Sequence, residues 1–188
     1  MPAPLPRGAN AALTREIPGL KRVTLGVQWD AGNDDVLHGS LVMTTLLCDA
    51  DSRALSPEHL VFFNQLSSPE ESVVQAEQAL GGDQEQVIVD LAAVPEEVDR
   101  VLVAFYVNDS PGQHRTLGRL RSLRVRAVDA DSDSELVRSE DLAAALDRED
   151  ALTLGELYRH AGGWKFKVLG LGYTGGITAL ARDHGLTL

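Results

Sequence analysis

The sequence has few of the features on which secreted and membrane proteins rely. Its 188 residues include a single cysteine, Cys48, so no internal disulfide can form. No apolar run approaches the ~20 residues of a membrane-spanning helix. The opening segment 1–8 holds three prolines and lacks the uninterrupted apolar core of a signal peptide. These features predict a cytoplasmic protein with no transmembrane segment.

Basic residues are also scarce. There are 17 lysines and arginines against 28 aspartates and glutamates, which gives a formal net charge of −11. Proteins that bind duplexes draw much of their affinity from Lys and Arg side chains that neutralise phosphates, so we expect no nucleic-acid partner. The acidic balance is compatible with cation binding, with protein partners, or with solubility alone.

The hydrophobic pattern has the period of β-strands. Apolar and polar residues alternate over 23–29, 123–127 and 164–168, as in strands with one buried and one wet face. Four denser apolar runs are typical of central strands covered on both sides or at a sandwich core: Leu41–Cys48, Leu60–Phe63, Val87–Val89 and Val101–Val107. We therefore expect an all-β protein.

Helical patterning is short and sparse. It is limited to 94–98, 141–147 and 177–184. Turn signals rich in Gly, Asp and Pro separate the apolar runs, and neither a Pro/Ser-rich linker nor an internal repeat divides the chain. Many short strands with frequent turns predict one β-sandwich domain over residues 1–188, with a few short helices.

Three segments resemble a known family. They are Leu-Pro-Arg-Gly-Ala-Asn at 5–10, Phe-Phe-Asn-Gln at 62–65, and the long irregular block 155–176 with its Gly-Glu-Leu-Tyr-Arg, Trp-Lys-Phe and Gly-Leu-Gly-Tyr motifs. This pattern is similar to the tellurium-resistance TerD family. The resemblance implies a sandwich of two antiparallel sheets with calcium in acidic loops at one end. It also implies membership of a bacterial stress-response system whose other proteins would be partners. No reaction is securely assigned to the family, so the resemblance favours a non-enzymatic protein.

The acidic loops of that pattern are only partly present. Calcium takes six to eight oxygen ligands, so a tight site needs several converging carboxylates. Counting along the family pattern, Ser40 and Val42 occupy two positions that it makes acidic, and Val74 occupies a third. Asp83 and Glu85 keep the acids of the last loop.

The remaining candidate calcium ligands are few, namely Asp83, Glu85, Asn64, Asp30 and Asp34. The leading hypothesis is a calcium-binding-type stress-response module with one weakened ion site centred on Asp83. The alternative is a metal-independent protein-interaction module of the same fold. The sequence leaves the oligomeric state open.

Other motifs leave alternatives open. Arginines cluster at 115, 119, 121, 124 and 126, where they would either dock an acidic partner or a phosphorylated ligand or form the wet face of an edge strand. The acidic segment 129–140 nearly fits an EF-hand loop. However, Ser134 replaces the required glycine, so we predict a hairpin turn. Cys48 ends an apolar run and is expected to be a buried, inert thiol rather than a nucleophile. The Gly-rich segment 170–176 is interpreted as a tight turn or a close backbone approach.

Overall fold

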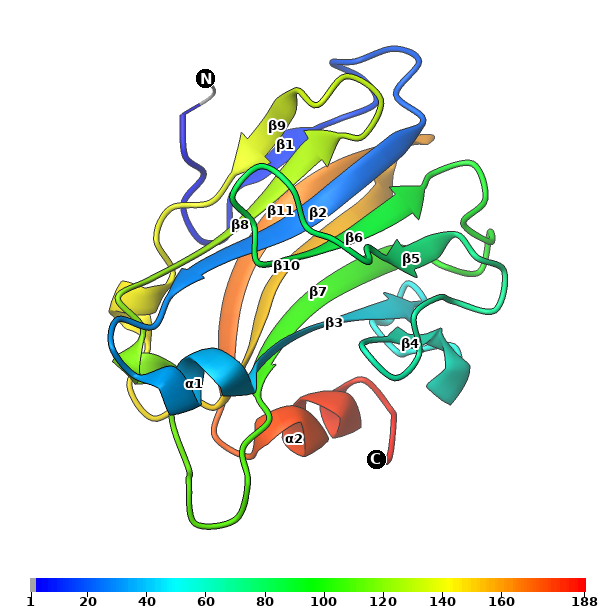
Figure 1. Cartoon of the computed structure of the whole chain (residues 1–188). Coiled ribbons are helices and arrows are strands. Elements are labelled where there is room, and N and C mark those ends of the chain that lie inside the picture. Colours follow the sequence, from blue (N-terminus) through cyan, green and yellow to red (C-terminus); the bar gives the residue numbers. More distant parts are fainter. Residues whose placement is uncertain (1–2) are drawn as a thin grey trace.

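In the computed structural model, residues 3–188 are described, and they form two antiparallel sheets stacked face to face (Figure 1). The first sheet has the order β1-β11-β10-β7-β3-β4 and the second the order β5-β6-β2-β8-β9. The six strands of the first sheet are β1 (Asn10–Ala12), β3 (Leu41–Cys48), β4 (Leu60–Val61), β7 (Arg100–Val107), β10 (Ala151–His160) and β11 (Gly163–Tyr173). The five of the second are β2 (Arg22–Asp30), β5 (Val73–Gln75), β6 (Glu85–Asp90), β8 (Ser122–Asp129) and β9 (Glu135–Arg138). The predicted all-β sandwich of two antiparallel sheets is confirmed.

The main core lies between the sheets. It is built from every second side chain of the long strands, such as Leu25 and Val27 of β2 against Phe105 of β7 and Phe166 of β11. Alternation along β2 therefore separates its core face from an outer face that carries Thr24, Gly26 and Gln28.

A second apolar cluster lies on the outer face of the six-stranded sheet. There α2 (Gly176–Asp183) packs against β7 and β10, and its Leu180 and Ala181 join the outer-face residues of β3 in this cluster. With this cluster on one face and the main core on the other, all eight residues of β3 are buried, as its dense apolar run predicted. The run Leu60–Phe63 behaves differently from the prediction, because only Leu60–Val61 pairs, as the edge strand β4.

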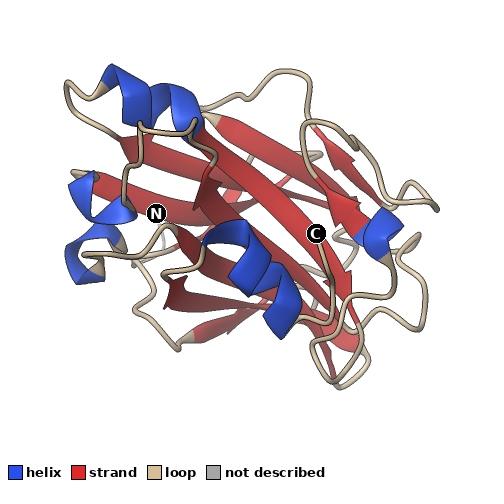
Figure 2. Cartoon of the chain, turned by 90° about the horizontal axis from the view of Figure 1, so that it is seen from below, coloured by secondary structure: helices blue, strands red, loops and turns tan. Residues whose placement is uncertain are grey.

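The helices are short and lie outside the strands (Figure 2). The expected segment 177–184 forms α2, and 141–147 contains one 3₁₀ turn at Ala143–Ala145; two further 3₁₀ turns span Pro57–His59 and Leu117–Arg119. Segment 94–98 is only a turn, closed by the Val98 amide donating to the Pro95 carbonyl at 3.0 Å. A helix that we did not predict, α1 (Asp35–Ser40), begins after Asp34, whose carboxylate accepts from the Leu37 amide. Asp34 is a typical N-cap, so this signal was present in the sequence.

Two smaller predictions have clear outcomes. Residues 129–135 form the hairpin turn between β8 and β9, as expected. In the Gly-rich segment, Gly170 and Gly172 lie within β11, and the chain bends only at 174–175, before α2. A Cβ at Gly172 would overlap the Glu149 side chain, which agrees with the interpretation as a close approach. Within residues 3–188, no helix is long and apolar enough to cross a membrane.

Candidate functional site

The five predicted calcium ligands do not converge in the structure. Asn64 is exposed in the tight turn between Phe62 and Gln65, and Asp30 ends β2 with its carboxylate accepting from the Gly32 amide at 2.7 Å. Over the described part of the chain, no group of three or more His, Cys, Asp or Glu side chains is placed to hold a metal. Asp83, Glu85 and Asp34 are each bonded to different partners in the chain.

Asp83 is held by an arginine. Its carboxylate is fully buried, and Arg126 of β8 reaches it from the neighbouring strands: Nε lies 2.8 Å from Oδ1 and a terminal nitrogen 3.1 Å from Oδ2. The side-chain amide of Gln86 also donates to Oδ2, at 2.6 Å. Gly26 lies beneath, where any Cβ would overlap the carboxylate. Both oxygens of Asp83 are therefore engaged by donors of the chain itself.

The pair is part of a larger network on the outer face of the five-stranded sheet. Arg126 also bonds Glu135 of β9 at 3.1 Å and the Gly81 carbonyl at 3.0 Å, and Arg138 bridges Glu135 to Gln28. The hydrogen bond from Arg138, together with that from Arg126, holds the pKa of Glu135 below its ordinary value. Two guanidinium groups thus neutralise two carboxylates and fix the 80–83 loop to β8 and β9.

The position of Arg126 corrects one prediction. We considered Arg124 and Arg126 as the wet face of an edge strand, and the two side chains do share the outer face. However, β8 lies between β2 and β9 and is not an edge. The Arg126 side chain is only 12% exposed, because it lies over the sheet and pairs with acids on both sides. From the sequence, the alternation along this strand predicted only that Arg124 and Arg126 share one face. It could not predict which acids pair with Arg126.

Glu85 points to the opposite side of the same sheet. It pairs with Val27, whose side chain is in the core, and its carboxylate accepts a hydrogen bond from the Met43 amide of β3 in the other sheet. Burial raises the pKa of Glu85, and the Met43 hydrogen bond opposes this only in part. Asp83 and Glu85 are therefore two residues apart in sequence but separated by the sheet.

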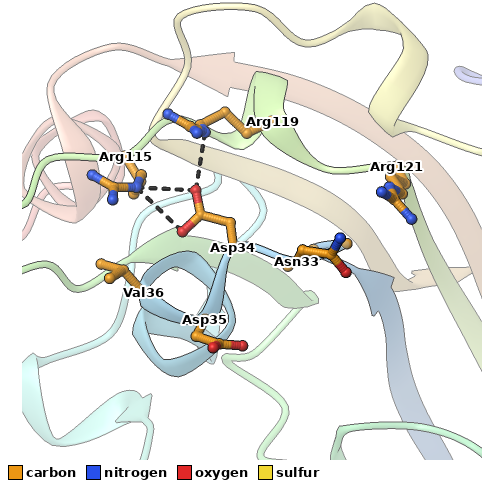
Figure 3. Close-up of a pocket in the computed structure, with 9 residues that line it drawn as sticks. Asn33, Asp34, Asp35, Val36, Arg115, Arg119 and Arg121 are labelled. Carbon is orange, nitrogen blue, oxygen red and sulfur yellow. Dashed lines mark hydrogen bonds and ion pairs between the residues drawn. The ribbon is translucent and has the colours of Figure 1, made fainter.

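Asp34 is the third engaged acid. Its Oδ2 lies 3.0 Å from Nε of both Arg115 and Arg119, while its Oδ1 caps α1 (Figure 3). The hydrogen bond from the Leu37 amide lowers the pKa of Asp34, and the two arginines act in the same direction against the cost of burial.

The comparison with known families settles what kind of protein this is. The TerD domain model matches residues 1–184. The chain belongs to the TerD family. It is 37% identical to general stress protein 16U of Bacillus subtilis (strain 168) over 187 residues, covering 97% of this chain and 96% of that protein. It is also 32% identical to tellurium resistance protein TerD of an Alcaligenes species, covering 99% and 98% of the two chains.

Solved structures share the fold of this TerD-family chain. A homologue of telluride resistance protein (TerD) from Streptomyces coelicolor A3(2) superposes with a TM-score of 0.68 at 22% identity, covering 90% of this chain and all of that one. Val42 and Val74 are two of the positions where the resemblance led us to expect an acid. Val42 is buried in the outer apolar cluster, and Val74 is 39% exposed on β5.

Proposed function

We propose that this TerD-family chain is a non-enzymatic stress-response module that recognises other proteins through loops ordered by its own arginines rather than by calcium. The observation that carries the proposal is the Asp83 carboxylate, fully buried and bonded at both oxygens by Arg126 and Gln86. This is the alternative that the sequence left open beside the calcium-binding module.

The donor set around Asp83 does not fit calcium. A calcium ion would need six to eight oxygens, whereas nitrogen donors surround this carboxylate and supply the positive charge. A planar guanidinium that forms two parallel bonds to a carboxylate is also the strong form of an ion pair. For a cation to enter, Arg126 would have to leave Asp83, Glu135 and the Gly81 carbonyl together. The loop before β6 is thus tied down without an ion.

The non-enzymatic part of the proposal is supported by the one thiol of the chain. Cys48 is 1% exposed in β3, and burial raises its pKa to about 12. Only the thiolate is an effective nucleophile, so a buried protonated thiol is suited to packing rather than to catalysis. The cytoplasmic location stays a prediction from the sequence.

One observation favours the calcium-binding alternative. Glu85 is a partly buried carboxylate that accepts a hydrogen bond from the Met43 backbone amide rather than from a cation, and burial raises its pKa. A cation bound beside it would offset this cost. If calcium binds this chain, Glu85 is therefore a better centre for it than Asp83.

Calorimetric titration with calcium distinguishes the two functions. For the wild type we expect no saturable heat up to about 1 mM calcium, the range of weak extracellular calcium modules. Saturable heat that persists in Asp83→Asn and disappears in Glu85→Gln would overturn the metal-independent module. Glu85→Gln keeps an oxygen that can accept from the Met43 amide, so we expect this variant to fold. It can therefore be titrated even if Asp83→Asn is too unstable.

A further inference from the structure

An open cavity of about 540 Å³ lies at the end of the sandwich where β2 runs into α1. One wall is the segment 31–36, and the other carries Arg115, Arg119 and Arg121 (Figure 3). None of these arginines belongs to the network around Asp83. The cavity is therefore a separate feature.

Asp34 positions two of the three arginines. It engages both Arg115 and Arg119 through their Nε atoms. One terminal nitrogen of Arg115 donates to the carbonyl of His114 at 3.2 Å and, at 3.4 Å, to that of Gln113. Among residues 3–188 no acceptor is paired with the other terminal nitrogen of Arg115 or with either terminal nitrogen of Arg119. Asp34 thus fixes the direction of two guanidinium groups and leaves much of their donor capacity unused.

Arg121 lies on the far side of Asn33 from that pair (Figure 3). Its backbone amide donates to the Asp30 carbonyl at 2.8 Å, which anchors the residue to the end of β2. Its side chain lies over Gly32, where a Cβ would come within 2.6 Å of Nε. Across the described residues its guanidinium has no ion-pair partner. Gly32, with φ +60°, gives this arginine the room to lie along the cavity wall.

The charges around the cavity favour an anion. Three guanidinium groups face two carboxylates, those of Asp34 and Asp35, and Asp34 is already engaged. The chain as a whole carries −11, so long-range attraction of an anion is weak or absent. Binding here would depend on direct hydrogen bonds at short range, and those are the contacts that guanidinium forks provide.

We propose that the cavity binds the phosphoryl group of a phosphate ester. A phosphoryl group has three acceptor oxygens and nearly two negative charges, which matches the several guanidinium groups lining this cavity better than a single carboxylate does. The inference goes beyond the proposed function and rests on other arginines. A calcium site at Glu85 would overturn that function and leave this pocket intact.

The test follows the arginine Nε–H signals of ¹⁵N-labelled protein while inorganic phosphate replaces chloride at constant ionic strength. We expect saturable shifts at Arg115, Arg119 and Arg121, and none at the exposed Arg148 outside the pocket. Arg121→Gln should weaken phosphate binding roughly tenfold, the effect of losing one charge-assisted contact. The matched charge change Arg148→Gln should alter it by less than about twofold. Arg121→Lys should not restore affinity, because an ammonium group lacks the planar fork.

Two further titrations identify the source of the phosphoryl group. A phosphoserine peptide that binds more tightly than inorganic phosphate, with its unphosphorylated form inactive, assigns the pocket to a phosphorylated partner protein. Equal or weaker binding of the peptide assigns it to a small phosphate ester. The proposal is overturned if phosphate shifts none of the three arginine signals. It is also overturned if Arg121→Gln and Arg148→Gln weaken phosphate binding equally, because equal effects indicate non-specific charge attraction.

Discussion

Arg126 Nε lies 2.8 Å from Asp83 Oδ1, and this ion pair joins β8 to the turn before β6, 43 residues away in sequence. The carboxylate is completely buried and the guanidinium nearly so. A buried pair of this kind stabilises little compared with an apolar pair of the same shape, but losing one partner leaves the other charge buried alone. This asymmetry makes the pair easy to test.

Removing one partner of the pair should be costly. Arg126→Gln leaves the Asp83 carboxylate buried without a cation, so it is expected to lower the free energy of unfolding by about 3–5 kcal/mol, measured by urea denaturation. The matched control is the exposed pair Arg22–Asp131, in which both side chains are nearly half exposed. Arg22→Gln should have a far smaller effect because solvent screens that pair. Equal losses in the two variants would contradict the account of a buried pair.

Gly26 should tolerate no side chain. A Cβ at this central β2 position would overlap the Asp83 carboxylate, so Gly26→Ala is expected to break the pair and destabilise the fold strongly. Gly39 of α1 has open space around its Cβ position, and Gly39→Ala should instead stabilise by up to about 1 kcal/mol through helix propensity. Thermal unfolding of both variants checks this. A neutral Gly26→Ala would show that the carboxylate can move away.

Glu85 should make stability depend on pH. Burial raises its folded-state pKa above the ordinary 4.5, so the folded protein holds this proton more tightly than the unfolded chain does. The resulting stabilisation is complete below pH 4.5 and is lost as the pH rises through the folded-state pKa. Glu85→Gln removes that loss. Its stability relative to the wild type should therefore increase between pH 4.5 and neutrality, as read from urea midpoints. A constant difference across this range would exclude the raised pKa.

Cys48 should be inert in the folded protein. Its side chain is buried and its pKa is raised to about 12 by burial, with the neighbouring Asp49 adding to the effect. A thiol-specific reagent such as DTNB should release no chromophore at pH 8 until urea unfolds the chain. Stoichiometric reaction with the native protein would reopen the possibility of a catalytic cysteine.

The sequence predicted the strands well because burial imposes a period of two on long segments such as 23–29 and 164–168. It could not predict that Asp83 and Glu85 would separate. Two residues apart, they would share a face within one strand. However, β6 begins at Glu85, so Asp83 lies in the preceding turn and its side chain reaches the outer face. The residue at which a strand begins depends on the strands that pair with it. The local sequence pattern does not contain this information.

The partners of the acidic residues could not be predicted either, because they are distant in sequence. Asp83 and Arg126 are 43 residues apart, and Asp34 and Arg115 are 81 apart. Only the register of β2 with β6 and β8 brings the first pair together. The arginine cluster could be recognised in the sequence. The sequence could not predict that Arg126 would be buried in an ion pair while Arg115, Arg119 and Arg121 line an open cavity.

The most direct test of the central claim is amide hydrogen exchange at Leu80, Asp83 and Gln84, measured in excess chelator and again with calcium. Their amides are bonded to Gln86 Oε1 and to the carbonyls of Leu80 and Val27 respectively. If Arg126 orders this loop, all three amides are protected in chelator, calcium changes nothing, and Arg126→Gln loses the protection. Fast exchange of the wild type in chelator, slowed by calcium, would contradict the account.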